Sequence, residues 1–323
     1  MLRLFRSNQP LIFFLIPLIT LLLWVKEFRL PGHADPFQSA MPAFDLVIGL
    51  IGNGNWLNPL FGLLFTLLSA YMVGQLNRQY IFIQERSQMP VIFFILVSGT
   101  FSTLHSLHPL HIALPFFLMA ISRILGTYRI DKLSYNPFES AFFVGIAGLF
   151  YGPSIMFLPV VWIGLLLFRP GYWREWFFTI AGFAVPWIFW LTGLLIAGIP
   201  VLEFREKFVS SLISRHTYEL SSQQWLFLGF LLLLTLVSSQ VMIRKIQSNK
   251  ILARRSFNLF FWIFFVGVAS YSIIPSVGIE ILIALAVPVA YLFTHFFIHV
   301  RRNWWGELLL WIMTVLVVLV AFS

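Results

Sequence analysis

The sequence contains no cysteine. Disulfides, thiolate metal ligands, cysteine nucleophiles and lipidated cysteines are therefore excluded. Charged residues are also scarce, at 10% of the 323 residues, whereas a soluble domain carries roughly 25%. Familiar enzyme motifs are missing too: the chain has no Walker loop, no dinucleotide-binding glycine pattern, no His-Glu-x-x-His and no nucleophile elbow. Any chemistry must therefore come from ionisable groups in or beside a membrane.

Long apolar runs fill the chain instead. Hydrophobic residues make up 59% of the sequence, and the mean hydropathy is +0.89. Membrane β-strands would show alternating polarity over about ten residues, whereas these runs are continuous and long enough for helices. The sequence therefore predicts an all-α, polytopic transmembrane bundle that forms a single integral membrane domain over residues 1–323, with no soluble domain.

The basic residues predict the orientation of the bundle. The net charge of +9 comes from Lys and Arg in short loops, where they determine topology and contact lipid headgroups rather than nucleic acid. Arg3 and Arg6 place the N-terminus in the cytoplasm, and the loop around Arg244 to Arg255 is the most basic. We expect a multi-pass protein of the bacterial inner membrane, with a retained first helix and an external C-terminus.

About eleven membrane segments follow from this pattern. The interpretation of residues 137–168 decides the number of membrane segments, because a single long span there would place every later loop on the opposite side of the membrane. Since Gly-Pro breaks helices, we interpret this region as two short spans broken at Tyr151-Gly152-Pro153. The full set of predicted segments is 11–25, 58–76, 90–104, 109–125, the two pieces of 137–168, 176–199, 225–242, 257–274, 277–298 and 304–322.

Two long polar connections, residues 26–57 and 200–224, are predicted to be external. The first contains Asp35 and Asp45 amid apolar residues. A carboxylate there would act as a general base on an acceptor hydroxyl, or hold a divalent cation that bridges a lipid phosphate. The alternative is a solvated loop, with Asp45 near the start of a helix that lies on the membrane surface.

The second connection has Phe204, Phe208 and Leu212 at helical spacing, which predicts an amphipathic helix on the outer leaflet. Its cations would clamp the diphosphate of a lipid headgroup. An ordinary surface helix with mixed charges is the alternative. The candidate substrate-binding residues of this connection are Arg205, Lys207, Arg215 and His216.

Other ionisable groups lie closer to the predicted spans. His105, His108 and His111 share a spacing that can bring them to one helical face, but no carboxylate accompanies them, so we interpret them as interfacial anchors rather than a metal site. Arg123 either snorkels to the headgroups or pairs with Glu139. Glu280 is a further candidate for substrate binding if it faces the bundle interior; the alternative is an external interfacial position.

The chain resembles two known groups of membrane proteins. The stretch Asn136-Pro-Phe-Glu-Ser-Ala-Phe-Phe-Val-Gly-Ile-Ala-Gly-Leu-Phe-Tyr-Gly-Pro-Ser, then Phe168-Arg-Pro and Trp173-Arg-Glu-Trp, resembles an uncharacterised Bacteroidota family of multi-pass inner-membrane proteins. The layout also resembles the GT-C membrane glycosyltransferases: an acidic residue in the first external loop, external surface helices and a broken short helix in mid-chain. The adjacent acidic pair frequent in that loop is absent here.

Three functions remain open. A GT-C-like enzyme would transfer sugar from a polyprenyl phosphate carrier at the external face, with Asp35 or Asp45 as base or metal ligand. A non-catalytic subunit of an envelope assembly complex would have a stable membrane-protein partner. A lipid or small-solute transporter would line its path with Glu280 and Arg123, although no inverted repeat is visible.

Overall fold

The computed structural model describes residues 10–29, 40–52, 56–83, 87–130, 133–215, 220–245, 251–300 and 303–322. Within these ranges the protein is helical, with no strand beyond one isolated antiparallel bridge between Ala40 and Tyr151. The predicted all-α class is therefore confirmed. Asp35 and His216, both candidate site residues, lie outside the described ranges.

Within the described residues, six helices are long and apolar enough to cross a membrane, and they mark the chain as a membrane protein. They are α4 (Leu57–Tyr80), α9 (Arg174–Ile196), α11 (Ser222–Lys245), α12 (Ile251–Ile273), α13 (Ile281–His299) and α14 (Asn303–Phe322). The remaining elements are α2 (Pro10–Arg29), α3 (Pro42–Ile51), α5 (Met89–Ser98), η1 (Ser102–Leu104), α6 (Pro109–Leu125), α7 (Asn136–Phe150), η2 (Gly152–Phe157), α8 (Leu158–Phe168) and α10 (Val201–Ile213).

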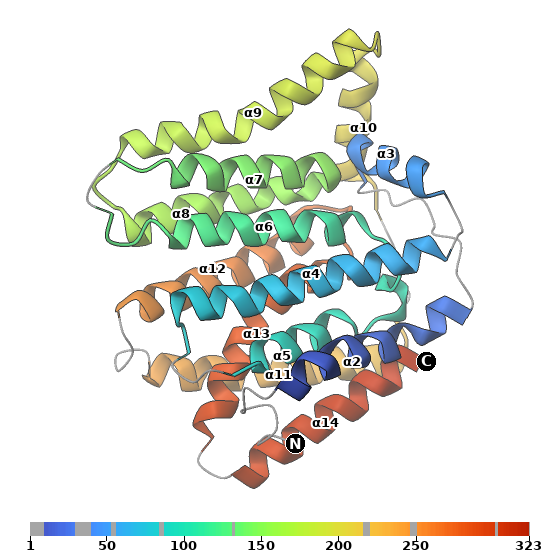
Figure 1. Ribbon diagram of the computed structural model, residues 1–323, viewed down its shortest axis with the longest axis vertical. Helices are drawn as coiled ribbons and strands as arrows, with labels where there is room; N and C mark the ends of the chain where they lie inside the picture. The colour runs from blue at the N-terminus through green and yellow to red at the C-terminus, as the bar shows by residue number, and fades with distance from the viewer. Residues whose placement is uncertain are drawn as a thin grey trace.

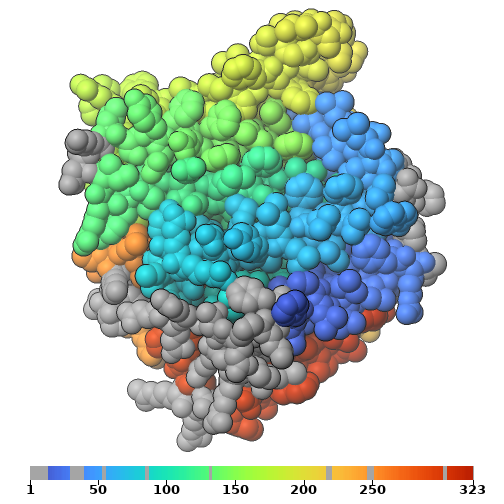
Figure 2. Space-filling model, in the orientation of Figure 1, coloured from blue at the N-terminus to red at the C-terminus, as the bar shows by residue number. Residues whose placement is uncertain are grey.

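Most helices run side by side, and successive long helices run in opposite directions (Figure 1). Helix α13 forms the core of the bundle: 94% of its apolar window is buried, and it packs against α5, α11 and α12. Every residue of α5 is buried as well. The short helices α3 and α10 lie together at one end of the bundle (Figures 1 and 2), which we call the α3–α10 end.

The break predicted in mid-chain is confirmed. Helix α7 ends at Phe150, Tyr151 is extended, and the 3-10 turn η2 leads into α8. A side chain at Gly152 would overlap the Ser211 hydroxyl of α10, so glycine is needed for the close approach of α10 to the break. The number of membrane crossings and the side of each terminus stay predictions.

The helix predicted over residues 90–104 is shorter than expected, because α5 ends at Ser98 with Gly99 as its C-cap. Polar residues follow, and the hydroxyl of Thr100 donates to the Leu96 carbonyl. A ten-residue helix cannot span a bilayer, which needs about 20 residues. Since α5 is wholly buried, protein rather than lipid surrounds it.

Candidate functional site

An ion pair joins the two external connections predicted from the sequence. Asp45, in the first turn of α3, pairs through Oδ2 with Nζ of Lys207 on α10. Both side chains are nearly half exposed, at 47% and 41%, so a ligand can reach them from solvent. The structure thus brings together one predicted base and one predicted phosphate-binding cation that are 162 residues apart in sequence.

The chain just before α3 is attached to the mid-chain break. The Met41 backbone N–H donates to the Phe150 carbonyl at 3.2 Å, and Ala40 forms the antiparallel bridge with Tyr151. Ala43 and Phe44 then bury the inner face of α3. These contacts hold Asp45 on the outer face of α3 and fix its position relative to η2.

Helix α10 is held by its apolar stripe, as the spacing predicted. Trp187 of α9 packs edge-on against Phe204 and Phe208, with ring centroids 5.9 and 5.5 Å apart. The Ser276 hydroxyl donates to the Ser211 carbonyl at 2.5 Å. Residues 201–213 thus form a helix with its apolar stripe on one face, but the stripe packs on protein rather than on the outer leaflet, whose side stays a prediction.

The other cations of this connection do not join the pair. Arg205 lies two residues before Lys207, and residues two apart do not share a helical face. Arg215 lies beyond the end of α10 and is exposed. Burial lowers the pKa of Lys207, while the Asp45 carboxylate beside it favours the charged ammonium.

Glu280 lies beneath this surface and is buried, with 1% of the residue exposed. Its Oε1 accepts from the Gly278 backbone N–H at 2.9 Å and from the Tyr151 hydroxyl at 3.4 Å. Of the two alternatives for Glu280, the structure therefore has the one that faces the bundle interior, and an exposed interfacial position is wrong. The carboxylate lies at the start of α13 and bonds Tyr151 in the mid-chain break. The same break is bridged to Ala40, just before α3.

The interpretation of the three histidines as interfacial anchors is also wrong, because all three are buried. Nδ1 of His108 accepts from the Leu110 N–H, and Nδ1 of His111 accepts from the His108 N–H, so together they cap α6. His105 lies in the loop before α6, stacked on Trp24 with centroids 4.8 Å apart. Burial lowers the pKa of His105 to about 4, so its ring is neutral at physiological pH.

Metal binding finds no support in the described residues, which contain no group of three His, Cys, Asp or Glu that could hold a metal ion. The Nδ1 atoms of His108 and His111 already serve as acceptors for backbone N–H groups. Among the described residues, Asp45 is therefore not part of a group of three such side chains that could hold a divalent cation.

An apolar cavity of about 340 Å³ lies beside α10, between η2 and the end of α12. Its walls include Met156 of η2, Phe208 and Leu212 of α10, and Ile273 of α12. Lys207 precedes Phe208 directly and so lies on a different face of the helix. The α3–α10 end therefore has a charged pair at the surface and an apolar cavity on another face of α10.

Two ion pairs lie away from this end, in the connections between α6 and α9. Arg123 pairs with Glu139 at 2.9 Å. Of the two alternatives for Arg123, the structure therefore has the ion pair. Sequence reasoning missed the second pair, in which Nε of Arg169 donates to Glu175 at 2.6 Å. The sequence signal for this pair was an Arg and a Glu at the two ends of the short turn between α8 and α9.

No protein-family model, curated protein or solved structure matches this chain.

Proposed function

We propose that the protein is a membrane transferase that takes a sugar from a polyprenyl phosphate carrier at the α3–α10 end. The observation that carries this proposal is the Asp45–Lys207 pair, formed by two surface helices at an end of the bundle where α10 also lines an apolar cavity. The resemblance of the layout to GT-C glycosyltransferases supports it at the level of architecture. In this proposal the α3–α10 end faces outward from the bacterial inner membrane, with about eleven membrane segments beneath it.

The ion pair accounts for the two roles that such a reaction needs. A lipid phosphate that enters the site competes with Asp45 for the Lys207 ammonium, and the carboxylate is then released to accept a proton. The acceptor hydroxyl oxygen attacks the anomeric carbon of the sugar as its proton passes to Asp45. The bond from that carbon to the phosphate oxygen breaks, and the polyprenyl phosphate leaves with the electron pair beside Lys207.

Separate variants test the two roles. Lys207→Ala should lose bound polyprenyl phosphate lipid, measured by native mass spectrometry of protein extracted in mild detergent. Asp45→Asn should retain the sugar-linked lipid but lower transfer to an acceptor by about 10²- to 10⁴-fold, the usual contribution of a general base. Glu203→Gln, an exposed change on the same helix, should alter neither quantity. Normal lipid binding and transfer in both site variants would refute the assignment.

A role as a non-catalytic subunit has one specific observation in its favour. Only 17% of the apolar window of α9 is buried, and the C-terminal end of α9 projects with α10 from the body of the bundle (Figure 2). A membrane-protein partner would cover this surface, and gentle extraction would then recover a stoichiometric complex that tolerates Asp45→Asn.

The transporter interpretation has less support. Arg123, in the last turn of α6, pairs with Glu139. Glu280 lies near the other end of α6, because it accepts a hydrogen bond from Tyr151, whose ring packs against His108, the N-cap of α6. Fifteen residues of helix separate His108 from Arg123, which is about 22 Å. A path lined by both groups would have to run most of the length of α6. In that case Glu280→Gln should alter solute uptake, and unchanged uptake would count against the transporter.

A further inference from the structure

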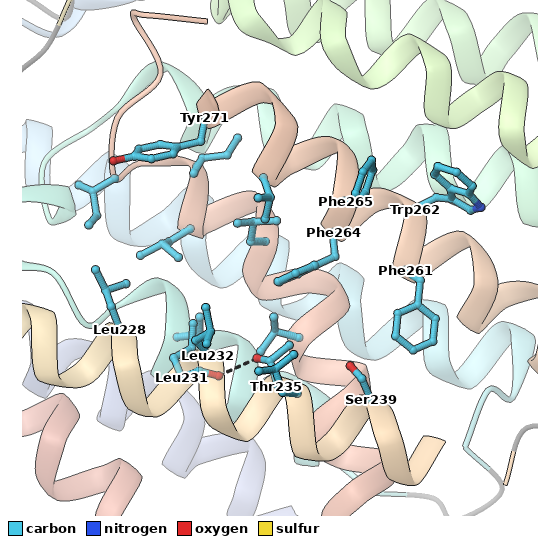
Figure 3. Close-up of a pocket in the computed structure, with 18 of the residues that line it drawn as sticks. Leu228, Leu231, Leu232, Thr235, Ser239, Phe261, Trp262, Phe264, Phe265 and Tyr271 are labelled. Atoms are coloured by element: carbon cyan, nitrogen blue, oxygen red, sulfur yellow. Dashed lines mark hydrogen bonds between the residues drawn. The ribbon is translucent and has the colours of Figure 1, made fainter. Parts of the chain in front are cut away.

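Helices α11 and α12 pack on α13 and diverge from each other, leaving a cavity of about 780 Å³ between them (Figure 3). Small-molecule sites have volumes of roughly 300–1,000 Å³. The floor is the buried face of α13, with Leu282, Leu285 and Val289. The cavity is therefore large enough for a ligand and has a well-packed floor.

The rim shows where this cavity opens. Leu232 and Phe265, on opposite walls, are 61% and 64% exposed although both line the cavity. These side chains belong to helices long and apolar enough to cross a membrane. The opening therefore faces sideways from the bundle, toward hydrocarbon rather than water.

The cavity is long and narrow rather than round. On α11 its lining runs from Trp225 to Ser239, fourteen residues that span about 21 Å. This exceeds half of the ~30 Å hydrocarbon core of a bilayer. The Thr235 hydroxyl, about one turn before Ser239 on this wall, donates to the Leu231 carbonyl, so its proton is already bonded within the helix. The shape and chemistry suit an extended hydrocarbon chain.

A partner helix fits this lining poorly. Helix–helix contacts in membranes favour Gly, Ala, Ser and Thr, which allow backbones to approach closely. Of these types the described cavity lining contains Thr235 and Ser239 but no Gly or Ala, and Leu, Phe, Trp, Val and Ile dominate it. Large flexible side chains accommodate a flexible chain better than a second rigid helix.

Basic residues continue both walls at the Ser239 end. Arg254 lies seven residues before Phe261, so it shares the cavity face of α12, about 10 Å further along. Its side chain is exposed. Arg244 and Lys245 form the last turn of α11 at the same end. Positive charge beside the end of a membrane helix attracts anionic headgroups.

We propose that the cavity between α11 and α12 is a binding site for an anionic phospholipid. One acyl chain lies in the cavity between Trp225 and Ser239, and the phosphate is held by Arg254 with the cations that end α11. This site is separate from Asp45 and Lys207, and it does not depend on the transferase proposal.

Lipid retention tests this site. Protein reconstituted in nanodiscs of phosphatidylglycerol and phosphatidylcholine in equal parts is re-extracted and weighed by native mass spectrometry. We expect retained phosphatidylglycerol, reduced about fivefold by Arg254→Gln, since one cation near the surface contributes about that factor. Val268→Trp, which fills the cavity, should abolish retention.

Matched controls separate the site from general membrane affinity. Arg78→Gln changes an exposed cation at the end of α4, and Val318→Trp adds an indole on α14, which does not line the cavity. Both should retain lipid as the unchanged protein does. Equal retention of the two lipids, retention that survives Val268→Trp, or a polyprenyl lipid or protein found in the cavity instead would each overturn the proposal.

Discussion

At the scale of single residues, the buried charges are the most informative groups. Arg169 and Glu175 are 2% and 0% exposed, and each has further partners: Glu175 accepts from the Ser134 N–H, and Arg169 donates to the Ile130 carbonyl and lies over the Tyr172 ring. A buried charge is stable only when it is paired and hydrogen-bonded. This pair therefore fastens the loop before α7 to the turn that starts α9.

Glu175→Gln should destabilise the protein by about 3–5 kcal/mol, because it leaves the Arg169 charge buried without its counter-ion. Glu139→Gln is the matched control, since its pair with Arg123 is half exposed and exposed pairs contribute about 0–1 kcal/mol. Denaturant titration in detergent micelles measures both changes. Equal losses in the two variants would show that the buried pair has no special role.

At the scale of elements, close backbone approach decides how α7 and α9 pack. A methyl group on Gly182 of α9 would overlap the Phe138 carbonyl of α7. A methyl group on Gly193, in the same helix, would meet nothing within 4 Å. Small residues at helix contacts are typical of membrane bundles, so α9 contacts the body through one small face and exposes the rest.

Gly182→Ala should therefore lower the melting temperature, since overpacking costs about 1–3 kcal/mol. Gly193→Ala should leave it unchanged or raise it slightly, because alanine favours an exposed helix by about 1 kcal/mol. Thermal unfolding of the two variants in one detergent gives the comparison. A destabilising Gly193→Ala, or a neutral Gly182→Ala, would contradict the packing described.

Several elements could be predicted from local sequence, and several contacts could not. The break at Tyr151-Gly152-Pro153 and the stripe of α10 follow from neighbouring residues, and the structure has both. Trp24 of α2 packs against His105 and His111, and Asp45 is paired by Lys207 of α10. Such contacts join distant segments, and no local periodicity specifies them.

At the scale of the whole molecule, the ends of the bundle differ in character. Helices α3 and α10 cover one end, and the C-terminal ends of α4 and α6 lie at the other (Figure 1). The basic loops predict that this second end is cytoplasmic. The orientation decides whether Asp45 and Lys207 face outward, where the proposed carrier would deliver its sugar.

The absence of cysteine makes the orientation directly measurable, because a single introduced thiol has no background. Leu202→Cys on α10 and Tyr135→Cys before α7 are both at exposed positions, at 59% and 72%. A membrane-impermeant maleimide should label position 202 in intact cells, and position 135 only after the membrane is opened. The reverse pattern would invert the topology and move the proposed site to the cytoplasmic face.

The close packing of α5 on α13 also sets an order on biogenesis. Helix α5 is too short to span a bilayer alone, and α13, which covers it, is made about 180 residues later. At ordinary rates of synthesis this interval is roughly 10 to 40 s. During that time the nascent chain holds α5 without its final neighbour, and the Tyr291 hydroxyl that will bond the Val73 carbonyl does not yet exist. Chains that stop before α13 would thus expose the unpacked core of the bundle to membrane proteases and insertion chaperones.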